Sequence, residues 1–456
     1  MSGQLTVPGA LTTDLYEVGM ALAYLRDGMT GEAVFGLFVR KLPPRRGFLV
    51  AAGLESALSY LEGLRVGHTE AAAFAEALHR PVEDLEPLVG LEFTGEVRAV
   101  PEGRIVFAGE PLLEVRAPLP QAQLAETSLL NLISHQTAVA SKAARCRIAA
   151  AGRPVVDFSL RRTQGVEAGL RMARLGALVG FAGTSNVAAA TAYGIPAVGT
   201  MAHSFVEAYE DEEAAFRAFA RAHPGPVTFL VDTYDTEEGV ATAARVLRDL
   251  GHVPGTGCGV RLDSGDLGDL AVRARRILDA AGLGEVRIVA SGGLDEDAIE
   301  ALVRSGAPVD VYAVGTRVGV SADAPYLDSA YKLAVYDGRP VMKLSAGKVT
   351  APGAKQVFRG PGLADTVGLW DEAPPPGTEP LLGTVMSGGH RVAGPAPLPA
   401  VRERFEADLA ALPEEARRIA DPVAPRPAVS GALAELTERV RHRIERRVFG
   451  GRAADG

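Results

Sequence analysis

Two stretches in the middle of the chain show the pattern that decides the fold. Residues 227–235 read VTFLVDTYD and residues 258–266 read CGVRLDSGD, so each short apolar run ends in a group of polar residues. Strands that are buried on both faces of a parallel sheet are continuously apolar, and a helical pattern follows each run, at residues 236–250 and 267–281. Each stretch therefore predicts a β-strand followed by a helix.

The same pattern occurs seven times between residues 155 and 316. The apolar runs are 155–160, 177–182, 196–199, 227–231, 258–262, 287–290 and 309–314, and Arg, Asp, Ser or Thr follows within two residues of the end of each. Successive βα units predict an α/β fold with an irregular or incomplete barrel of parallel strands. The active site of such a barrel lies at the carboxyl ends of its strands.

The regions on either side of the barrel have a different pattern. Residues 93–115 contain short alternating strands separated by glycine and proline, which favours an antiparallel sheet, and strand-like sequence returns after Thr316. We therefore expect an α+β, sandwich-like domain in residues 1–125 and a catalytic barrel in residues 126–330. In residues 331–456, we expect strands that rejoin the first domain, followed by peripheral helices.

The composition is typical of a cytoplasmic enzyme. The chain has 47 basic and 56 acidic residues, so any phosphate site must be built locally, and we expect no nucleic-acid partner. Its two cysteines, Cys146 and Cys258, cannot form a disulfide framework or a four-cysteine zinc site, and we expect no zinc. The sequence has neither a signal-peptide pattern nor an apolar stretch of about 18 residues, so we expect no membrane partner.

Three cationic or titratable side chains follow the first and third runs. Arg161 and Arg162 come directly after residues 155–160, and guanidinium groups match the geometry of phosphates and carboxylates. A surface ion pair at a helix start is the simpler alternative. His203 follows residues 196–199, where an imidazole can act as acid, base or nucleophile, although a lone histidine is more often structural.

Two pairs of aspartates follow neighbouring strands. Asp is favoured at helix N-caps, which is the expected role of Asp235 and Asp266. Asp232 and Asp263 are then left to hold magnesium, directly or through water, or to orient sugar hydroxyls.

The last two strand ends are rich in glycine. Residues 291–293 read Ser-Gly-Gly, and Gly315 and Thr316 end the seventh run. Barrel enzymes often bind a phosphate here through backbone N–H groups, although a Gly-Gly pair alone is usually a turn. The residues by themselves predict a barrel enzyme that handles a phosphorylated, magnesium-bound substrate, and they do not name the reaction.

Longer motifs carry a family resemblance. They are TDLY (13–16), FVRK (38–41), AGLE (52–55), FSLRRTQG (158–165), GTSNV (183–187), GTMAHS (199–204), VRLDSGDL (260–267) and the lysines Lys343, Lys348 and Lys355. In this order, from about residue 11 to 360, they resemble nicotinate phosphoribosyltransferase. The resemblance implies that nicotinate and phosphoribosyl pyrophosphate react to give nicotinate mononucleotide and pyrophosphate. This step opens NAD salvage, and the resemblance also implies magnesium and coupled ATP hydrolysis.

The resemblance also implies roles for the residues that bind the pyridine base. Phe158 and, from another subunit, Tyr16 correspond to an aromatic pair that sandwiches the ring. Arg261 corresponds to the group that binds the nicotinate carboxylate. Thr184 and Ser185 correspond to substrate-binding residues. Ser185 stands where nicotinamide-using relatives have an aspartate, and a carboxylate there would repel nicotinate.

Further implied roles concern the phosphates. Arg161 binds phosphate or pyrophosphate, Asp232 and Asp263 place magnesium or ribose, and ATP phosphorylates His203 so that the enzyme binds its substrates more productively. The implied ligands of the 5-phosphate are Ser291, Gly292, Gly293, Gly315 and Thr316. Arg40, Lys343 and Lys355 correspond to basic positions that reach the pyrophosphate or ATP site across the interface of a homodimer.

Three alternatives remain open. Nicotinamide phosphoribosyltransferase has the same architecture, and Ser185 is the main argument against it. Quinolinate phosphoribosyltransferase shares the barrel, but its chains are much shorter and the motif around His203 would be superfluous. A non-catalytic protein that binds phosphoribosyl pyrophosphate is disfavoured, because every candidate polar position holds a chemically usable residue.

Overall fold

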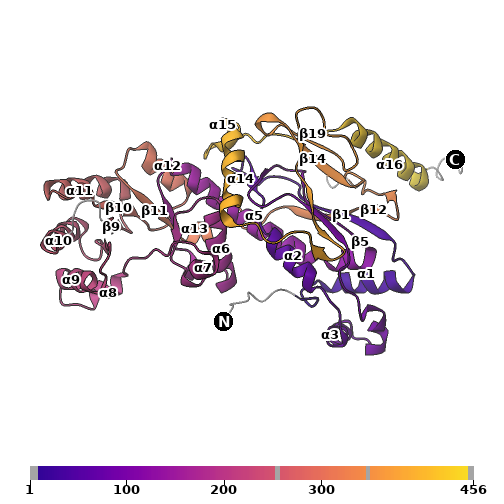
Figure 1. Cartoon of the computed structure of the whole chain (residues 1–456), viewed down its shortest axis with the longest axis horizontal. Coiled ribbons are helices and arrows are strands. Elements are labelled where there is room, and N and C mark those ends of the chain that lie inside the picture. The colour runs from indigo at the N-terminus through magenta and orange to yellow at the C-terminus, as the bar shows by residue number, and fades with distance from the viewer. Residues whose placement is uncertain (1–8, 252–256, 346–349, 450–456) are drawn as a thin grey trace. The chain divides into compact units, whose positions relative to one another are not determined.

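The computed structural model describes residues 9–251, 257–345 and 350–449, which form two compact units (Figure 1). The first unit contains the described residues up to 138 and those from 326 onward, and the second contains residues 139–325. The sequence predicts boundaries after residues 125 and 330, whereas the units divide after residues 138 and 325.

The second unit is built on a six-stranded parallel sheet. Its strand order is β7-β6-β11-β10-β9-β8, so β7 and β8 do not pair with each other and the barrel is incomplete. The strands are β6 (Val155–Asp157), β7 (Gly183–Thr184), β8 (Thr228–Leu230), β9 (Gly259–Leu262), β10 (Arg287–Ala290) and β11 (Val311–Val314). The predicted incomplete barrel of parallel strands is confirmed.

Two of the seven predicted strands differ from the structure. Residues 177–182 are the end of helix α6 (Val166–Leu178) and the turn after it, in which Gly180 has a φ of 94°. Residues 196–199 contribute only an isolated bridge between Ala197 and Thr184. A short apolar run at the end of a buried helix looks the same as a strand in sequence, and this explains the first error.

Several helices of the second unit begin at aspartates. Asp235 and Asp266 accept backbone N–H groups at the starts of α10 (Thr236–Asp249) and α11 (Leu267–Ala280), as predicted, and Asp295 caps α12 (Glu296–Arg304) in the same way. The other helical segments are η2 (Leu160–Arg162), α7 (Val187–Tyr193), α8 (His203–Glu207), α9 (Glu212–Ala222) and α13 (Thr316–Gly319).

A buried ion network fixes the start of α12. Glu296 accepts from Lys142 at 2.5 Å and from Arg145 at 3.1 Å, and Lys142 also lies 3.0 Å from Asp323. Lys142 and Arg145 belong to α5 (Glu126–Ala149), and both side chains are fully buried. Removing one partner from such a network leaves a buried charge uncompensated, which typically costs about 3–5 kcal/mol. The network therefore anchors the chain just beyond residues 291–293.

The first unit contains a seven-stranded antiparallel sheet in the order β13-β12-β1-β5-β3-β17-β18. Its strands are β1 (Glu32–Val39), β3 (Glu96–Ala99), β5 (Pro111–Pro118), β12 (Ser329–Tyr336), β13 (Arg339–Pro340), β17 (Gly383–Ser387) and β18 (His390–Arg391). Since β12 pairs with β1 and β17 pairs with β3, C-terminal strands rejoin the N-terminal sheet as predicted.

Two smaller sheets and the remaining helices complete this unit. The sheets are β16-β14-β15-β19 and β2-β4. Their strands are β2 (Leu49–Val50), β4 (Ile105–Val106), β14 (Lys355–Arg359), β15 (Asp365–Leu369), β16 (Glu379–Pro380) and β19 (Ala428–Val429). The helical segments are α1 (Leu15–Arg26), α2 (Leu54–Gly63), α3 (His68–Leu78), η1 (Val82–Leu88), α4 (Leu119–Leu124), η3 (Pro361–Leu363), α14 (Leu398–Ala411), α15 (Glu414–Arg417) and α16 (Gly431–Phe449).

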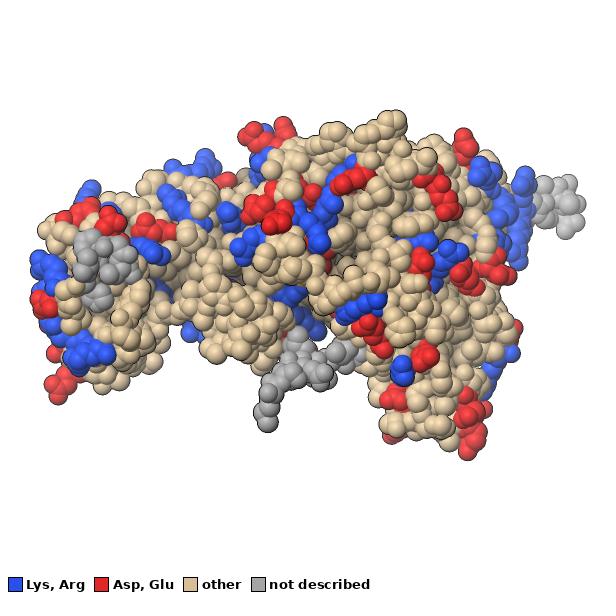
Figure 2. Space-filling view, in the orientation of Figure 1, with Lys and Arg blue, Asp and Glu red and all other residues tan. Residues whose placement is uncertain are grey.

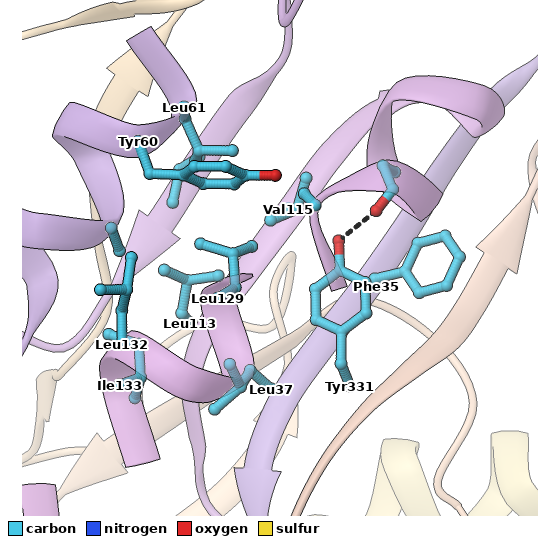
Figure 3. Packing of buried hydrophobic residues seen from close by; sticks show 14 of the residues in the cluster. Phe35, Leu37, Tyr60, Leu61, Leu113, Val115, Leu129, Leu132, Ile133 and Tyr331 are labelled. Atoms are coloured by element: carbon cyan, nitrogen blue, oxygen red, sulfur yellow. Dashed lines mark hydrogen bonds between the residues drawn. The ribbon is translucent and has the colours of Figure 1, made fainter. Parts of the chain in front are cut away.

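The core of the first unit joins residues from both ends of the chain. Phe35 of β1 stacks on Tyr331 of β12 with ring centroids 4.8 Å apart, and the Tyr331 hydroxyl donates to Ala122 O at 2.9 Å (Figure 3). Leu113 and Leu129 are buried in the same cluster. A buried tyrosine needs a hydrogen-bond partner, and here the partner fixes β12 against α4.

The surface of the molecule mixes both signs of charge. Figure 2 shows basic and acidic side chains interspersed over the visible face. Among the helices of the described residues, none has the length and apolar character required to cross a bilayer.

A pair of carboxyl groups is buried in the first unit. Glu110 is fully buried, and Asp365 is held by two hydrogen bonds from Arg359 at 3.0 and 2.6 Å. Burial, followed by the negative charge of Asp365, raises the pKa of Glu110 well above its usual range. Glu110 therefore keeps its proton in the folded protein at pH values where it ionises in the unfolded chain.

We expect Glu110→Gln to remove part of the pH dependence of stability. Because the folded pKa is raised, the contribution of Glu110 is complete below its unfolded pKa of about 4.3 and is lost as pH rises through the folded value. Glutamine retains an oxygen for the Phe107 N–H and cannot ionise. Urea unfolding midpoints between about pH 5 and pH 9 should fall less steeply for the variant. The exposed control Glu76→Gln should follow the wild type, and identical slopes for Glu110→Gln would contradict this explanation.

Candidate active site

Arg261 lies at the centre of the predicted site. It is 8% exposed, and its guanidinium donates to Ser291 Oγ (2.8 Å), Thr200 Oγ1 (2.7 Å), Met201 O (3.3 Å) and Asp263 Oδ1 (2.9 Å). These bonds engage four of its five N–H donors. A single hydrogen bond to a ligand is therefore available without rearrangement, whereas a bidentate interaction with a carboxylate would require the exchange of one bond.

Asp263 connects Arg261 to the neighbouring strand ends. Its Oδ1 also accepts from Ser291 Oγ at 2.5 Å. Burial opposes its ionisation, but the hydrogen bonds from Ser291 and Arg261 outweigh that effect and lower the pKa of Asp263. Asp232 Oδ2 in turn accepts from Asp263 N–H (3.0 Å) and from Ser264 Oγ (2.5 Å). The two predicted carboxylates are thus adjacent, and hydrogen bonds from the protein hold both of them.

These two carboxylates suit magnesium, which completes its coordination with water and phosphate, better than a metal that needs three or more protein ligands. Asp232 Oδ1 is buried and accepts no hydrogen bond from the described residues. Within that part of the chain, no three His, Cys, Asp or Glu side chains gather in a way that suits a metal ion. Magnesium usually binds through one or two carboxylates together with waters and substrate phosphates. Asp232 and Asp263 can supply such a site.

His203 is the accessible member of the cluster. It is the first residue of α8, and its side chain is 41% exposed. Its Nδ1 lies 3.2 Å from Thr233 Oγ1, and its Nε2 lies 4.0 Å from Asp263 Oδ2. If Nδ1 carries the proton toward Thr233, the lone pair on Nε2 is free to act as a nucleophile. Thr233 directly follows Asp232 after β8 and was not among the residues predicted from the sequence.

The predicted base-binding residues lie at the ends of β6 and β7. Phe158 is half-buried, its ring lies 5.6 Å from the Arg261 guanidinium, and its N–H donates to Val314 O at 2.7 Å. Ser185 is exposed, whereas Thr184 is fully buried. The Thr184 hydroxyl donates to Asp157 and accepts from the backbone, so it belongs to the framework behind the displayed residues. Burial raises the pKa of Asp157. This residue was also not among those predicted from the sequence.

The glycine-rich loop at residues 291–293 packs tightly on β9. A Cβ on Gly292, which has a φ of 89°, would lie 1.8 Å from Asp263 O, so no other residue fits there. Gly293 and Thr316 are exposed, and Gly315 is partly exposed. Their backbone groups can therefore be reached by an anion.

Two arginines near these loops differ in their pairing. Arg317 directly follows Thr316 and forms a 2.8 Å ion pair with Asp295. This pair links the two glycine-rich segments. Arg317 was not among the residues predicted from the sequence. Arg161 of η2 is exposed and available to an anion. The structure thus places the predicted residues of the second unit around one rim of the sheet.

Tyr16 belongs to the first unit and is held by its neighbour in sequence. It lies on α1 and is 51% exposed. Glu17 is fully buried and accepts from Thr127 N–H at 3.0 Å and from Thr127 Oγ1 at 2.5 Å at the start of α5. Asp14 Oδ2 lies 2.8 Å from the same hydroxyl oxygen and is the alternative acceptor of its single proton. The TDLY motif therefore presents Tyr16 from a firmly anchored turn.

Two of the predicted basic residues line one cavity of the first unit, of about 1300 Å³. Arg40 forms a 2.8 Å ion pair with Asp328 there. Lys355 is buried, its Nζ donates to Gly353 O at 2.7 Å, and it lies 3.7 Å from Glu114 Oε1. Burial lowers the pKa of Lys355, although Glu114 opposes the shift. Both cations already have protein partners.

Of the two other lysines in residues 343–355, Lys343 is not among the described residues that line this cavity. Lys343 is exposed, and its N–H donates to Thr350 Oγ1 at 3.2 Å. Lys348 lies outside the described residues.

The fold and the site together define a class of protein. An incomplete parallel barrel with a buried arginine, adjacent carboxylates, an accessible histidine and a glycine-rich loop is typical of barrel enzymes that act on anionic, phosphorylated substrates. The chain matches the nicotinate phosphoribosyltransferase (NAPRTase) N-terminal domain over residues 11–134 and the NAPRTase family over residues 154–316. It belongs to the nicotinate phosphoribosyltransferase family.

Individual relatives support this membership over nearly the whole chain. Nicotinate phosphoribosyltransferase pncB2 of Mycobacterium tuberculosis is 47% identical over 94% of both chains, and the Bacillus subtilis nicotinate phosphoribosyltransferase is 42% identical over 77% of this chain and 73% of its own. The crystal structure of human nicotinic acid phosphoribosyltransferase superposes with a TM-score of 0.82 and 31% identity, covering 94% of this chain and 99% of that one.

A second solved structure is also similar. Nicotinate-nucleotide pyrophosphorylase from Pyrococcus furiosus superposes with a TM-score of 0.74 and 26% identity, over 88% of this chain and 95% of that one.

We expect Gly292→Ala to lose phosphoribosyl transfer activity by about 100-fold, because the added methyl group displaces the loop or the Asp263 backbone by roughly an ångström. Gly293→Ala is the matched control. It has a similar φ of 73° but nothing within 4 Å of the added Cβ, so only backbone strain of about 1–2 kcal/mol is expected. Initial rates and thermal unfolding of both variants test this. Equal losses of activity in the two variants would refute the close packing as the cause.

Proposed function

We propose that this chain transfers the phosphoribosyl group of phosphoribosyl pyrophosphate to the ring nitrogen of nicotinate, with coupled ATP hydrolysis, as a cytoplasmic homodimer. The products are nicotinate mononucleotide and pyrophosphate. The observation that carries the proposal is the Arg261–Asp263–His203 cluster at the strand ends of a chain that belongs to this family throughout.

The chemistry needs positioning and charge stabilisation more than a nucleophilic side chain. The pyridine nitrogen attacks the anomeric carbon as pyrophosphate leaves, so the site must align two reactants and stabilise an oxocarbenium-like centre. Stacking of Phe158, and of Tyr16 from the second subunit, against the ring would contribute about 0.5–1.5 kcal/mol beyond area burial. Magnesium held by Asp232 and Asp263 would offset the charge of the departing pyrophosphate.

Recognition of nicotinate rests on charge. The Arg261 guanidinium lies beside the Phe158 ring and has one N–H donor left for the carboxylate of the base. Ser185 presents a neutral, exposed side chain at the neighbouring strand end. A nearby cation and the absence of a carboxylate at position 185 together favour an acid over an amide.

The phosphate groups would be bound by backbone and by exposed cations. We assign the 5-phosphate to the glycine-rich loops and the pyrophosphate to Arg161. The residues of the first group are Ser291, Gly292, Gly293, Gly315 and Thr316. Arg40 and Lys355 line one cavity, which supports their assignment, together with Lys343, to a shared anion site for pyrophosphate or ATP contributed by the other subunit.

His203 is proposed as the site of phosphorylation by ATP. Its half-exposed imidazole is accessible to a phosphate donor, and Thr233 can hold the Nδ1 proton so that Nε2 attacks. The phosphorylated histidine would add negative charge next to Asp232 and Asp263, which would strengthen the binding of magnesium and its substrate.

One product assay separates this proposal from its alternatives. Purified protein is mixed with magnesium and phosphoribosyl pyrophosphate, and nicotinate, nicotinamide and quinolinate are offered in parallel, with and without ATP. Nicotinate mononucleotide formed from nicotinate alone, and faster with ATP, supports the proposal. Turnover of nicotinamide or quinolinate would favour the related enzymes, and the absence of product would favour a binding protein.

We expect His203→Ala to lose the stimulation by ATP and to retain some ATP-independent turnover, because the direct attack on the anomeric carbon needs no imidazole. Initial rates of nicotinate mononucleotide formation at several ATP concentrations measure this. His223→Ala, at an exposed position of the same unit, should keep the stimulation. Full ATP coupling in His203→Ala would exclude the proposed phosphorylation site.

We expect Ser185→Asp to abolish the preference for nicotinate over nicotinamide, because the new carboxylate repels that of the substrate. Like charges placed together cost several kcal/mol, so the ratio of kcat/KM values should fall by about 100-fold or more. Ser185→Asn, which is polar and neutral, is the control and should keep the preference. An unchanged ratio in Ser185→Asp would remove this residue from the explanation of specificity.

A further inference from the structure

Asp157 lies between the two segments that present the base-binding residues. It is the last residue of β6, is 1% exposed, and directly precedes Phe158. Its Oδ1 accepts from Ser159 N–H at 2.9 Å, on the far side of Phe158. Its backbone carbonyl accepts from Ser185 N–H at 2.8 Å. Asp157 thus bonds both to Ser159, which follows Phe158, and to Ser185.

Thr184 completes the connection through its side chain. Its hydroxyl donates to Asp157 Oδ2 at 2.7 Å and accepts from Asn186 N–H at 3.0 Å. The two bonds bracket Ser185, since they hold the residues on either side of it. Because the single hydroxyl proton points to Asp157, the oxygen is left to accept from Asn186, and only a hydroxyl can make both bonds.

The cost of this arrangement indicates a role beyond packing. Asp157 is a buried carboxylate, and no basic side chain of the described residues forms an ion pair with it. Burying such a group is unfavourable unless hydrogen bonds compensate, and here donors from two different strand ends supply them. A carboxylate can accept two donors at once on separate oxygens, whereas an asparagine must present one donor of its own.

We infer that Asp157 and Thr184 are positioning residues that hold Phe158 and Ser185 in one fixed arrangement and thereby set the affinity and selectivity for the pyridine base. The inference rests on the proposed function, in which Phe158 stacks on the ring and Ser185 admits the carboxylate. Neither positioning residue touches the substrate. Among the described residues, no hydrogen bond joins the glycine-rich loop at residues 291–293 to Asp157 or Thr184, whereas the segment after β11 packs on Phe158 and Ser159. Loss of the Thr184 bonds should therefore affect nicotinate more strongly than phosphoribosyl pyrophosphate.

The test compares Thr184→Val, Thr184→Ser and Asp157→Asn with the wild type in steady-state assays in which nicotinate and phosphoribosyl pyrophosphate are varied separately. Thr184→Val keeps the shape of the side chain and removes both hydrogen bonds. Its KM for nicotinate should rise by about tenfold or more, as expected for the loss of a charge-assisted bond, while the KM for phosphoribosyl pyrophosphate stays within about twofold. Thr184→Ser should recover most of this loss, and Asp157→Asn should resemble Thr184→Val.

The outcomes separate the inference from the proposed function. Turnover of nicotinate by the wild type tests the proposed function in the same experiment. If the wild type is active, equal KM values for nicotinate in Thr184→Val and wild type, or equal rises for both substrates, would overturn the positioning role. If Thr184→Val does not fold, the nearly isosteric Asp157→Asn decides the question by the same two KM values. The ratio of nicotinate to nicotinamide turnover should fall with the rise in KM for nicotinate.

Discussion

The ion pair between Arg261 and Asp263 is the interaction on which the rest of the site depends. It is short, at 2.9 Å, and Arg261 is almost fully buried. Each partner also forms a hydrogen bond outside the pair. The guanidinium donates to Thr200, and the carboxylate accepts from Ser291 at the end of β10. Because β9 lies between β8 and β10, the register of the sheet places these ends side by side. Loss of the Asp263 carboxylate would leave the Arg261 guanidinium buried without its ion-pair partner, which is among the most costly changes in a protein interior.

The site follows one rule on both sides of this pair. Apart from the buried Arg261, Ser291 and Lys355, most residues proposed to touch substrate are exposed or half-exposed, and a buried acidic residue lies directly behind several of them. Asp157 stands behind Phe158 and Ser185, and the buried Glu296 network stands behind the glycine-rich loop. Glu17 does the same for Tyr16 in the first unit. A carboxylate suits this task because it accepts several backbone and side-chain donors at once and thereby fixes loops that have no regular structure.

The sequence predicts features that depend on neighbouring residues and misses those that depend on distant ones. The capping roles of Asp235 and Asp266 follow from local spacing, and the structure has them. The incomplete barrel follows from the repeated βα pattern, although residues 177–182 were assigned to a strand because an apolar helix end has no distinguishing period. The roles of Thr233 and Asp157 arise from bonds between strand ends about 30 residues apart, and no local pattern marks them.

The distribution of burial explains how an acidic chain can recognise a highly charged substrate. With a net charge of −9, the molecule gains nothing from its overall field, so attraction must come from individual groups. A cation that selects a ligand is most effective where water is excluded, and the nearly buried Arg261 would suit the selective role proposed for it. A group that has to exchange partners during the reaction must instead remain accessible, and the half-exposed His203 and the exposed Arg161 fit the roles proposed for them. Selection and turnover therefore place opposite demands on burial, and the strand ends of one sheet meet both because they extend from a packed core to the surface.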